Sequence, residues 1–271
     1  MPLTDLIRYF NAADNAGDST LYPAGERVSA WHDGLRLESL FQPVVDLRQG
    51  QVIGHRARLS AQLDDGHPLS IEQAYARHRT AEAVVHFDRL NRTLHALNFL
   101  AQRRYAGGHL QLPVHPRHLR AVQSQHGLVY EAILKRCGLA PEDIVLVIDA
   151  HDFGQTPHWE EALNNYRQRG YQLALKNLTA QTATTVLPTL RPDMLQLSAD
   201  AAPELYEAAR QLEIVVQHNA IETGRDLEAA RAAGARFGIG ELFGLPQPDC
   251  RPTHKRDGVA YNSPTPSGSR S

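Results

Sequence analysis

Basic side chains occupy positions in the sequence where they could meet a ligand at the end of a strand. Arg56 and Arg58 close one apolar, strand-like run, and Lys176 and Asn177 close another. Guanidinium and ammonium groups attract oxyanions such as phosphate, and they oppose the binding of divalent cations. Two alternatives follow. These cations receive an anionic ligand, or they pair with acids such as Asp149 in a purely structural plug.

Histidines gather in one part of the chain, which raises the possibility of a zinc site. His109, His115, His118 and His126 lie within a short stretch. They lack the compact spacing of zinc ligands, and no cysteine pair lies near them. We therefore predict surface or capped histidines here and no metal centre.

The elements that must position these residues alternate between short apolar runs and longer helical patterns. Strands that alternate with helices imply an α/β protein with a mainly parallel sheet. Eight such runs favour a (β/α)8 TIM-like barrel, and an open doubly wound sheet is the alternative. No glycine-rich nucleotide loop follows the first run, which counts against the open sheet. The predicted strands are Leu40–Val45, Val52–Leu59, Leu110–Val114, Ile144–Ile148, Gln172–Leu175, Met194–Leu197, Ile214–Gln217 and Phe237–Ile239.

The two ends of the chain differ in pattern from this alternating region. Residues 1–35 are predicted to form a partly helical N-terminal extension, with a short amphipathic helix near the start and a second helix around residues 24–36. Residues 36–250 are predicted to form the barrel. Residues 251–271 are rich in Pro, Ser, Gly and charge, so a disordered C-terminal tail is expected from about residue 255.

Composition excludes several classes of function. The chain has 271 residues and a hydrophobic fraction of 42%, which suffices for a globular core. Its net charge of −2 implies no general attraction to nucleic acid or anionic lipid. Two cysteines make no disulfide framework, and the N-terminus lacks an apolar signal core. No apolar run is long enough to cross a membrane. A cytoplasmic location is the simplest interpretation.

Five short segments occur in a characteristic order along the chain: FQPVVDL at 41–47, PRHL at 116–119, GYQLAL at 170–175, IET at 221–223 and LFGLP at 242–246. Together they resemble the EAL domain family, whose active members are bacterial phosphodiesterases that hydrolyse cyclic di-GMP. The resemblance runs from about Arg36 to Pro246 and implies a barrel of the EAL type. Active relatives hold divalent metals with carboxylates at the C-terminal mouth of this barrel.

This chain departs from the family at the positions that carry the chemistry. The resemblance puts Arg56 at the first glutamate of the metal site and Ser60 at the arginine that pairs with phosphate. We therefore expect no metal cofactor and no hydrolysis, and cyclic di-GMP binding is not expected. The other family positions fall on Pro113, Val147, Ala150, Lys176, Asn177, Gln196, Ser198, Asn219 and Ile239.

These departures predict a non-enzymatic regulatory protein that binds another protein, in bacterial signalling over motility or biofilm, and that could form a homodimer. The alternative is a sensor that binds cyclic di-GMP or another anionic ligand at the barrel mouth. The helix over residues 86–98 is expected to cover the barrel with a solvated polar face, which could carry a protein contact. The candidate ligand-contacting or plug positions are Gln42, Arg56, Lys176, Asn177, Asn219 and Pro246.

Overall fold

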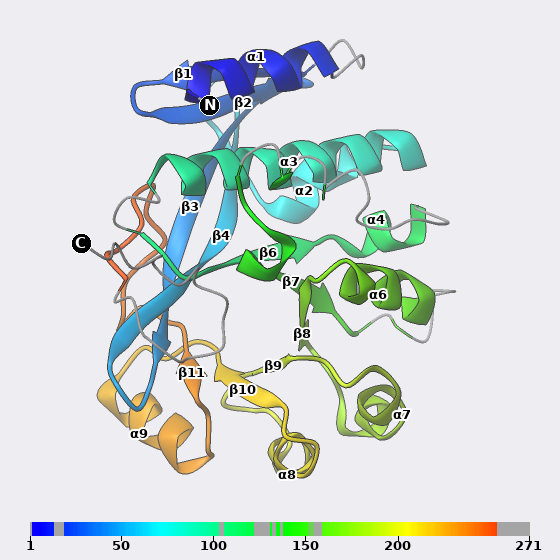
Figure 1. Ribbon diagram of the computed structural model, residues 1–271, viewed down its shortest axis with the longest axis vertical. Helices are drawn as coiled ribbons and strands as arrows, with labels where there is room; N and C mark the ends of the chain where they lie inside the picture. Colours follow the sequence, from blue (N-terminus) through cyan, green and yellow to red (C-terminus); the bar gives the residue numbers. More distant parts are fainter. Residues whose placement is uncertain are drawn as a thin grey trace, which may run out of the picture.

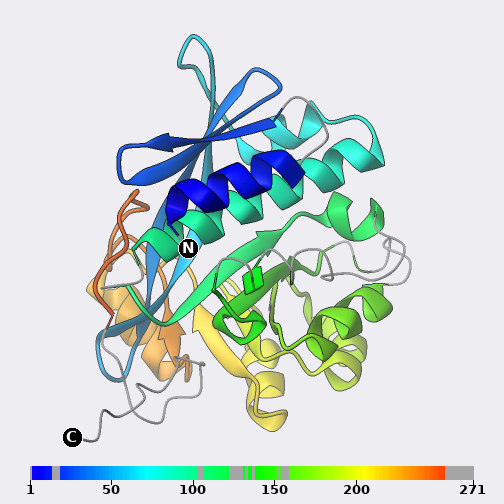
Figure 2. The same ribbon diagram turned by 45° about the horizontal axis from the view of Figure 1, so that its top comes forward.

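Eight strands close into a barrel in this computed structural model (Figures 1 and 2). The structure describes residues 2–13, 19–102, 106–121, 131, 134–135, 138–151, 153 and 159–253. The ring closes where β3 pairs with both β4 and β11. The predicted barrel is thereby confirmed over the open sheet. Its strands are β3 (Leu35–Asp46), β4 (Gln51–Leu63), β6 (His109–Val114), β7 (Ile144–Asp149), β8 (Gln172–Lys176), β9 (Met194–Leu197), β10 (Val215–His218) and β11 (Phe237–Gly238).

One barrel strand runs against the others. β3 is antiparallel to its two neighbours, whereas the pairings from β4 through β6 to β11 are parallel. A tight turn joins β3 to β4, where the Asp46 carboxylate accepts from the backbone N–H of Arg48 and Gly50 adopts a φ of 67°. The barrel therefore has two long hydrogen-bonded strands on one side and short parallel strands elsewhere.

Alternating side chains divide the barrel into an outer and an inner core. On β7, Leu146 and Ile148 pack toward the surrounding helices, while Val145 and Val147 belong to the apolar cluster inside the ring. The interior cluster also includes Met194. The covering helices are α3 (Ala81–Ala101), α4 (Pro116–Ala121), α6 (Trp159–Gln168), α7 (Ala180–Leu190), α8 (Pro203–Gln211) and α9 (Gly224–Ala232), with the short η1 (Pro141–Asp143) before β7.

The N-terminal part adds a helix and a hairpin to one end of the sheet. α1 (Leu3–Ala13) is followed by β1 (Ser19–Ala24) and β2 (Arg27–His32), and β2 pairs with β3. The predicted helix over residues 24–36 is therefore wrong. Asp33 and Gly34 have positive φ values of 47° and 71°, and they form the two-residue hairpin turn that connects β2 to β3. The predicted N-terminal helix over the first residues is confirmed.

The polar face of α3 is buried, which corrects the expectation of a solvated face. Figure 2 shows α1 and the β1–β2 hairpin lying over this helix. The Asn98 side chain donates to the Val28 carbonyl at 2.8 Å and accepts from the Val28 N–H at 2.9 Å. His95 Nδ1 lies 2.8 Å from the Ser39 hydroxyl, and burial lowers the pKa of His95 to about 4. Between them, α1 and the hairpin leave little of this face of α3 for a partner.

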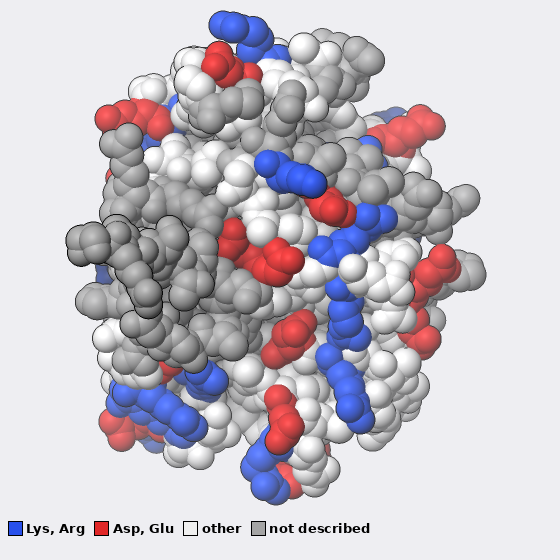
Figure 3. All heavy atoms as spheres, in the orientation of Figure 1, with Lys and Arg blue, Asp and Glu red and all other residues white. Residues whose placement is uncertain are grey.

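Smaller features complete the described chain. β5 (Pro68–Leu69) and α2 (Ile71–Ala76) connect β4 to α3, and Ser70 caps α2 by accepting from the Gln73 N–H. No helix among the described residues is long and apolar enough to span a membrane. Acidic and basic side chains lie interspersed on the face shown in Figure 3. The tail predicted to be disordered from about residue 255 lies outside the described residues.

Candidate functional site

The predicted site residues come from strands far apart in the chain. Parallel barrel strands end on the same side, so the residues that follow them share one mouth. Lys176 ends β8, Asn177 follows it, and Asn219 follows β10. Arg56 lies within β4, opposite Gln42 of β3 in the antiparallel register. Residues opposite each other in such a pair lie on the same face of the sheet.

Arg56 reaches across the barrel and donates to amide oxygens from three other segments. Its Nη2 donates to Gln196 Oε1 at 2.8 Å and to Asn219 Oδ1 at 2.7 Å. Its Nε makes a longer contact of 3.5 Å with Gln111 Oε1. Burial, with repulsion from Arg58 as a smaller cause, lowers the pKa of Arg56 to about 9. The guanidinium therefore stays charged at neutral pH.

Below this guanidinium, buried amides bond to one another inside the ring. Gln111 Nε2 donates to Gln217 Oε1 at 2.6 Å, and Gln196 Nε2 donates to Gln111 Oε1 at 3.1 Å. Gln217 Nε2 donates in turn to Asn219 Oδ1 at 3.1 Å. His109 lies 3.2 Å from Gln111, and burial lowers its pKa to about 3. This part of the interior, next to the apolar cluster, is therefore polar but uncharged, because it consists of amides and a neutral imidazole.

The second cation at the mouth is paired with an acid. Lys176 Nζ lies 3.3 Å from Asp149 Oδ2, and the Asn177 side chain donates to the same oxygen at 2.7 Å. Asn177 holds a positive φ of 56°, a conformation that asparagine tolerates better than most residues. The predicted pairing with Asp149 is thus present for Lys176. It is not present for Arg56, whose partners among the described residues are amides.

The remaining two candidates lie on the other side of the mouth. The buried Gln42 side chain donates from Nε2 to the Gly244 carbonyl at 3.1 Å. Backbone hydrogen bonds between Phe41 and Gln247 hold the segment that contains Pro246 against β3. No described hydrogen bond joins Pro246 to another candidate residue. The structure therefore brings Arg56 and Asn219 into contact, places Gln42 beside Arg56, and leaves Pro246 as part of the wall.

The donor set at the mouth does not fit a divalent cation. Such ions prefer several carboxylate or carbonyl oxygens at fixed geometry. Asp149 is already engaged by Lys176 and Asn177, and Arg56 contributes a positive charge. Among the described residues, no group of three or more His, Cys, Asp or Glu side chains could hold a metal ion. We derive no metal-dependent step for this site.

The clustered histidines differ from their prediction in one respect. His109 and His118 are buried, so the expectation of surface histidines is wrong for these two. His115 is partly buried, and its ring stacks on Tyr75 with 3.7 Å between the centroids. His126 lies outside the described residues. His109, His115 and His118 serve packing and hydrogen bonding at separate places in the barrel.

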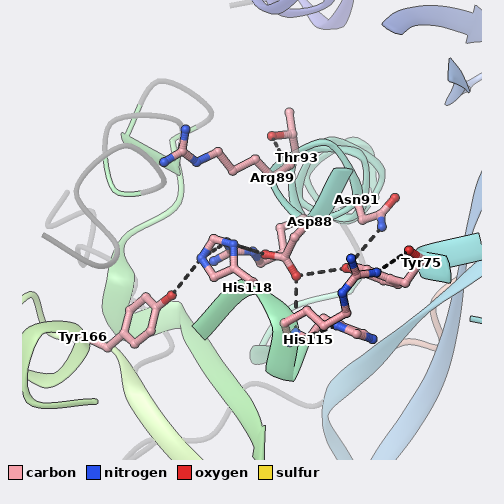
Figure 4. Close-up of polar contacts among 10 residues, drawn as sticks. Tyr75, Asp88, Arg89, Asn91, Thr93, His115, His118 and Tyr166 are labelled. Carbon is pink, nitrogen blue, oxygen red and sulfur yellow. Dashed lines mark hydrogen bonds and ion pairs between the residues drawn. The ribbon is translucent and has the colours of Figure 1, made fainter. Parts of the chain in front are cut away.

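A second polar cluster, which the sequence analysis did not identify, lies beneath α3 (Figure 4). Asp88 Oδ2 is 2.6 Å from Arg92 Nη2 and 3.3 Å from His118 Nδ1, and Oδ1 accepts from the Tyr75 hydroxyl at 2.9 Å. Burial opposes ionisation of Asp88, but Arg92 and His118 outweigh it and hold its pKa below the usual value. Figure 4 shows His118 between Asp88 and Tyr166. The four-residue spacing of Asp88 and Arg92 is the signal that could have indicated this pair.

The chain is similar to known proteins in both sequence and fold. The profile of the EAL domain matches residues 29–246. No curated protein sequence matches the chain. Among solved structures, the calcium and cyclic di-GMP complex of BlrP1 from Klebsiella pneumoniae superposes with a TM-score of 0.68 at 16% identity, over 91% of this chain and 66% of that one.

Two further solved structures are similar. The Bacillus subtilis YkuI protein, in complex with cyclic di-GMP and calcium, gives a TM-score of 0.65 at 18% identity, over 80% of this chain and 57% of that one. The PaMucR phosphodiesterase in complex with c-di-GMP gives 0.65 at 16% identity, over 78% and 92%. The chain thus spans about two thirds or less of BlrP1 and YkuI and most of PaMucR. On the extent of the profile match, this chain belongs to the EAL domain family.

Proposed function

We propose that this EAL domain protein is a non-catalytic regulator in cyclic di-GMP signalling, which acts by binding another protein in the control of motility or biofilm. Membership of the family and the cyclic di-GMP complexes of BlrP1 and YkuI support the signalling context. The observation that carries the proposal is the guanidinium of Arg56 at the mouth, bonded to three amide oxygens. The family resemblance puts the first metal-binding glutamate at this position.

The positive charge of Arg56 supports the absence of a metal-dependent reaction in this proposal. A guanidinium about 4 Å from a divalent ion opposes its binding by several kcal/mol at an effective dielectric of about 20. The amides around Arg56 supply oxygens, but these already accept hydrogen bonds from Arg56 and from one another. A metal would have to displace Arg56 and break this network. The barrel does not depend on a metal, because its apolar inner and outer faces hold it together.

The partner we propose is a protein, in a cytoplasmic setting, and a second copy of this chain is one candidate. A net charge of −2 supports neither a nucleic-acid nor a membrane partner. Near the mouth, Leu242 and Leu245 are 42% and 53% exposed, in the loop whose Gly244 carbonyl accepts from Gln42. Exposed apolar side chains next to a site are the contacts that a protein partner would cover.

The enzymatic half of the proposal is tested with the purified chain and cyclic di-GMP in the presence of magnesium or manganese. We expect no linear dinucleotide product above the level without protein. PaMucR is a suitable positive control, because it is a phosphodiesterase of similar fold. Product that accumulates with metal and disappears with a chelator would overturn the non-catalytic function.

The binding half is tested by affinity capture from the source cells, followed by titration of the purified partner. We expect a partner whose affinity falls in Leu245→Glu and is unchanged in Ile71→Glu. Ile71 is a matched control, since it is an exposed aliphatic residue in α2, away from the loop. A partner whose affinity neither variant changes would argue against the loop as the contact. Failure to capture any partner reproducibly would argue against the binding function itself.

A further inference from the structure

The sheet ends at β1, and no further strand lies beside the outer side of this strand within the described chain. β1 pairs with β2, whereas the opposite end of the sheet is the two-residue β5, which begins with Pro68. A strand at the end of a sheet presents backbone N–H and C=O groups to which a strand of another chain can bond. β1 is six residues long, so of the two ends it is the better template for an added strand.

A side chain of α1 occupies the outer side of β1. Asn11 Nδ2 donates to the Leu21 carbonyl at 2.8 Å, and Asn11 Oδ1 accepts from the Leu21 N–H at 2.9 Å. Two residues opposite each other in an antiparallel pair of strands exchange the same two kinds of bond. The Asn11 amide therefore takes the place of the backbone of a neighbouring strand.

One apolar face holds α1 against the hairpin. Leu6, Ile7 and Phe10 are buried in a cluster that includes Leu21 and Val28. Figure 1 shows α1 at the outer end of the molecule, beside β1 and β2 and away from the ring. The helix can therefore leave the hairpin without breaking the pairing of any barrel strand.

The outer side of β1 is complementary to itself. Both the N–H and the C=O of Leu21 point away from β2, so two copies related by a twofold axis at Leu21 can exchange both bonds. In this arrangement Ser19 of each copy lies opposite Pro23 of the other. The Ser19 N–H, which points to the same side as that of Leu21, then donates to the Pro23 carbonyl. The strand that fits this edge is thus β1 of a second copy.

We propose that α1 is an autoinhibitory cover on β1, and that displacing α1 lets two copies of the chain pair through this strand. Asn11 competes for the backbone groups that the second strand needs, so copies with α1 in place stay apart. The pairing uses β1 and not the loop that contains Leu242 and Leu245. The tests of this cover and of the proposed function can therefore fail separately.

Sedimentation velocity of the full chain over a range of concentrations tests the cover. Asn11→Asp removes the donor and places a carboxylate against the Leu21 carbonyl. We expect this variant to dimerise roughly tenfold or more tightly than the unmodified chain, since a lost hydrogen bond and an unsatisfied carbonyl both favour displacement of α1. Ala12→Asp is the matched control, because it adds the same charge one residue away, at an exposed position of α1, and should leave the association unchanged.

A second substitution identifies the strand that pairs. Proline is tolerated at the first residue of a strand, and Ser19→Pro removes an N–H that points away from β2. Adding Ser19→Pro to Asn11→Asp should therefore return the association to that of the unmodified chain. Hydrogen exchange gives a readout that a purely structural role of Asn11 would not produce. The Leu21 amide should exchange faster in dilute Asn11→Asp and slow again as the protein concentration rises.

Three results would overturn the proposal. The first is self-association of Asn11→Asp no stronger than that of the unmodified chain. The second is a dimer of Asn11→Asp that Ser19→Pro leaves intact. The third is an equally tight dimer of the unmodified chain that Ser19→Pro dissociates, because β1 would then be uncovered from the start. If Asn11→Asp does not fold, Asn11→Ala removes both bonds without adding a charge, and the same measurements on that variant decide.

Discussion

Gln111 and Gln217 lie 106 residues apart in the sequence, and Gln111 Nε2 donates to Gln217 Oε1 at 2.6 Å in the interior of the barrel. Both side chains are fully buried. Gln111 also accepts from Gln196, which in turn accepts from Arg56. This chain of amides joins β6, β9 and β10 to β4. The amide chain links these strands by hydrogen bonds inside the ring, which apolar side chains could not form. It also holds the Arg56 guanidinium in position.

Replacing Gln111 by leucine should therefore destabilise the barrel. Gln111→Leu leaves the Gln217 oxygen without its donor and the Gln196 amide without its acceptor. An unsatisfied buried group costs about 1–3 kcal/mol, so we expect the free energy of unfolding to fall by about that amount or more. Urea denaturation followed by circular dichroism measures it. The same change at Gln181, which is exposed on α7, should stay within about 0.5 kcal/mol. Equal effects at the two positions would contradict a stabilising network.

The ion pair between Asp88 and Arg92 should contribute far more than a surface pair of the same length. Asp88 and Arg92 side chains are 1% and 3% exposed. Arg92→Met removes the partner and leaves a buried carboxylate beside Tyr75 and His118, so we expect a loss of about 3–5 kcal/mol in the free energy of unfolding.

The matched control is the pair formed by Glu207 and Arg210 on α8. Its contact is also 2.6 Å, but its side chains are 49% and 74% exposed. Exposed pairs are screened by solvent and contribute little, so Arg210→Met should leave the free energy of unfolding nearly unchanged. Denaturant titrations of both variants under one buffer give the comparison. A loss for Arg92→Met no larger than that for Arg210→Met would show that the buried pair is not stabilising the fold relative to its broken state.

The barrel was predictable from the sequence because its signals are local. Apolar runs that alternate with helical periodicity recur along the chain, and all eight predicted strands are present in the ring. Their ends were less predictable. β3 begins at Leu35 and β4 extends to Leu63, because both strands continue past the barrel to pair with β2 and β5. Pairing beyond the ring is a tertiary effect that periodicity within one strand does not report.

The N-terminal hairpin and the polar face of α3 were mispredicted for related reasons. The Asp33-Gly34 turn is a strong hairpin signal, but the residues around it were interpreted as a helix. Because the hairpin was not predicted, no other segment was expected to cover Asn98 and His95. The polar face of α3 was therefore predicted to be exposed to solvent. At the mouth, residue types alone indicated the positive charge of Arg56. Its amide partners could not be predicted, since they come from strands that only the closed ring brings together.

The glycine directly before β6 should be among the least replaceable residues. Gly108 has a φ of 77°, and a Cβ at this position would lie 1.9 Å from the Ile53 carbonyl oxygen of β4. Gly108→Ala must therefore separate two paired strands, and we expect a loss of several kcal/mol or failure to fold. Gly66→Ala is the control, because its φ of 85° is similar but nothing lies within 4 Å. It should cost about 1 kcal/mol from backbone strain alone. Thermal melting measures both variants. A melting temperature of Gly66→Ala lower than that of Gly108→Ala would contradict the close approach between Gly108 and the Ile53 carbonyl.

Buried histidines should make the stability fall as the pH drops below 6.5, before the usual pKa range of carboxylates is reached. Burial lowers the pKa of His55 and His95 to about 4 and that of His109 to about 3, from a usual value of 6.5. The repulsion of Arg251 contributes at His55. These side chains are neutral in the folded protein and take up protons on unfolding below pH 6.5. Their contribution to stability is therefore fully present above pH 6.5 and is lost as the pH falls toward 4 and 3.

We expect the free energy of unfolding to decrease by up to about 1.4 kcal/mol per pH unit for each such histidine between pH 6.5 and 4. Denaturant titrations at pH 7.5, 6.0 and 5.0 measure this slope. His95→Gln removes one titrating group while an amide can still bond to Ser39, so it should reduce the slope between pH 6.0 and 5.0. The exposed His67 of the β4–β5 turn provides the control, and His67→Gln should leave the slope unchanged. A stability that stays constant from pH 7.5 to 5.0 would show that these histidines accept protons within the folded barrel.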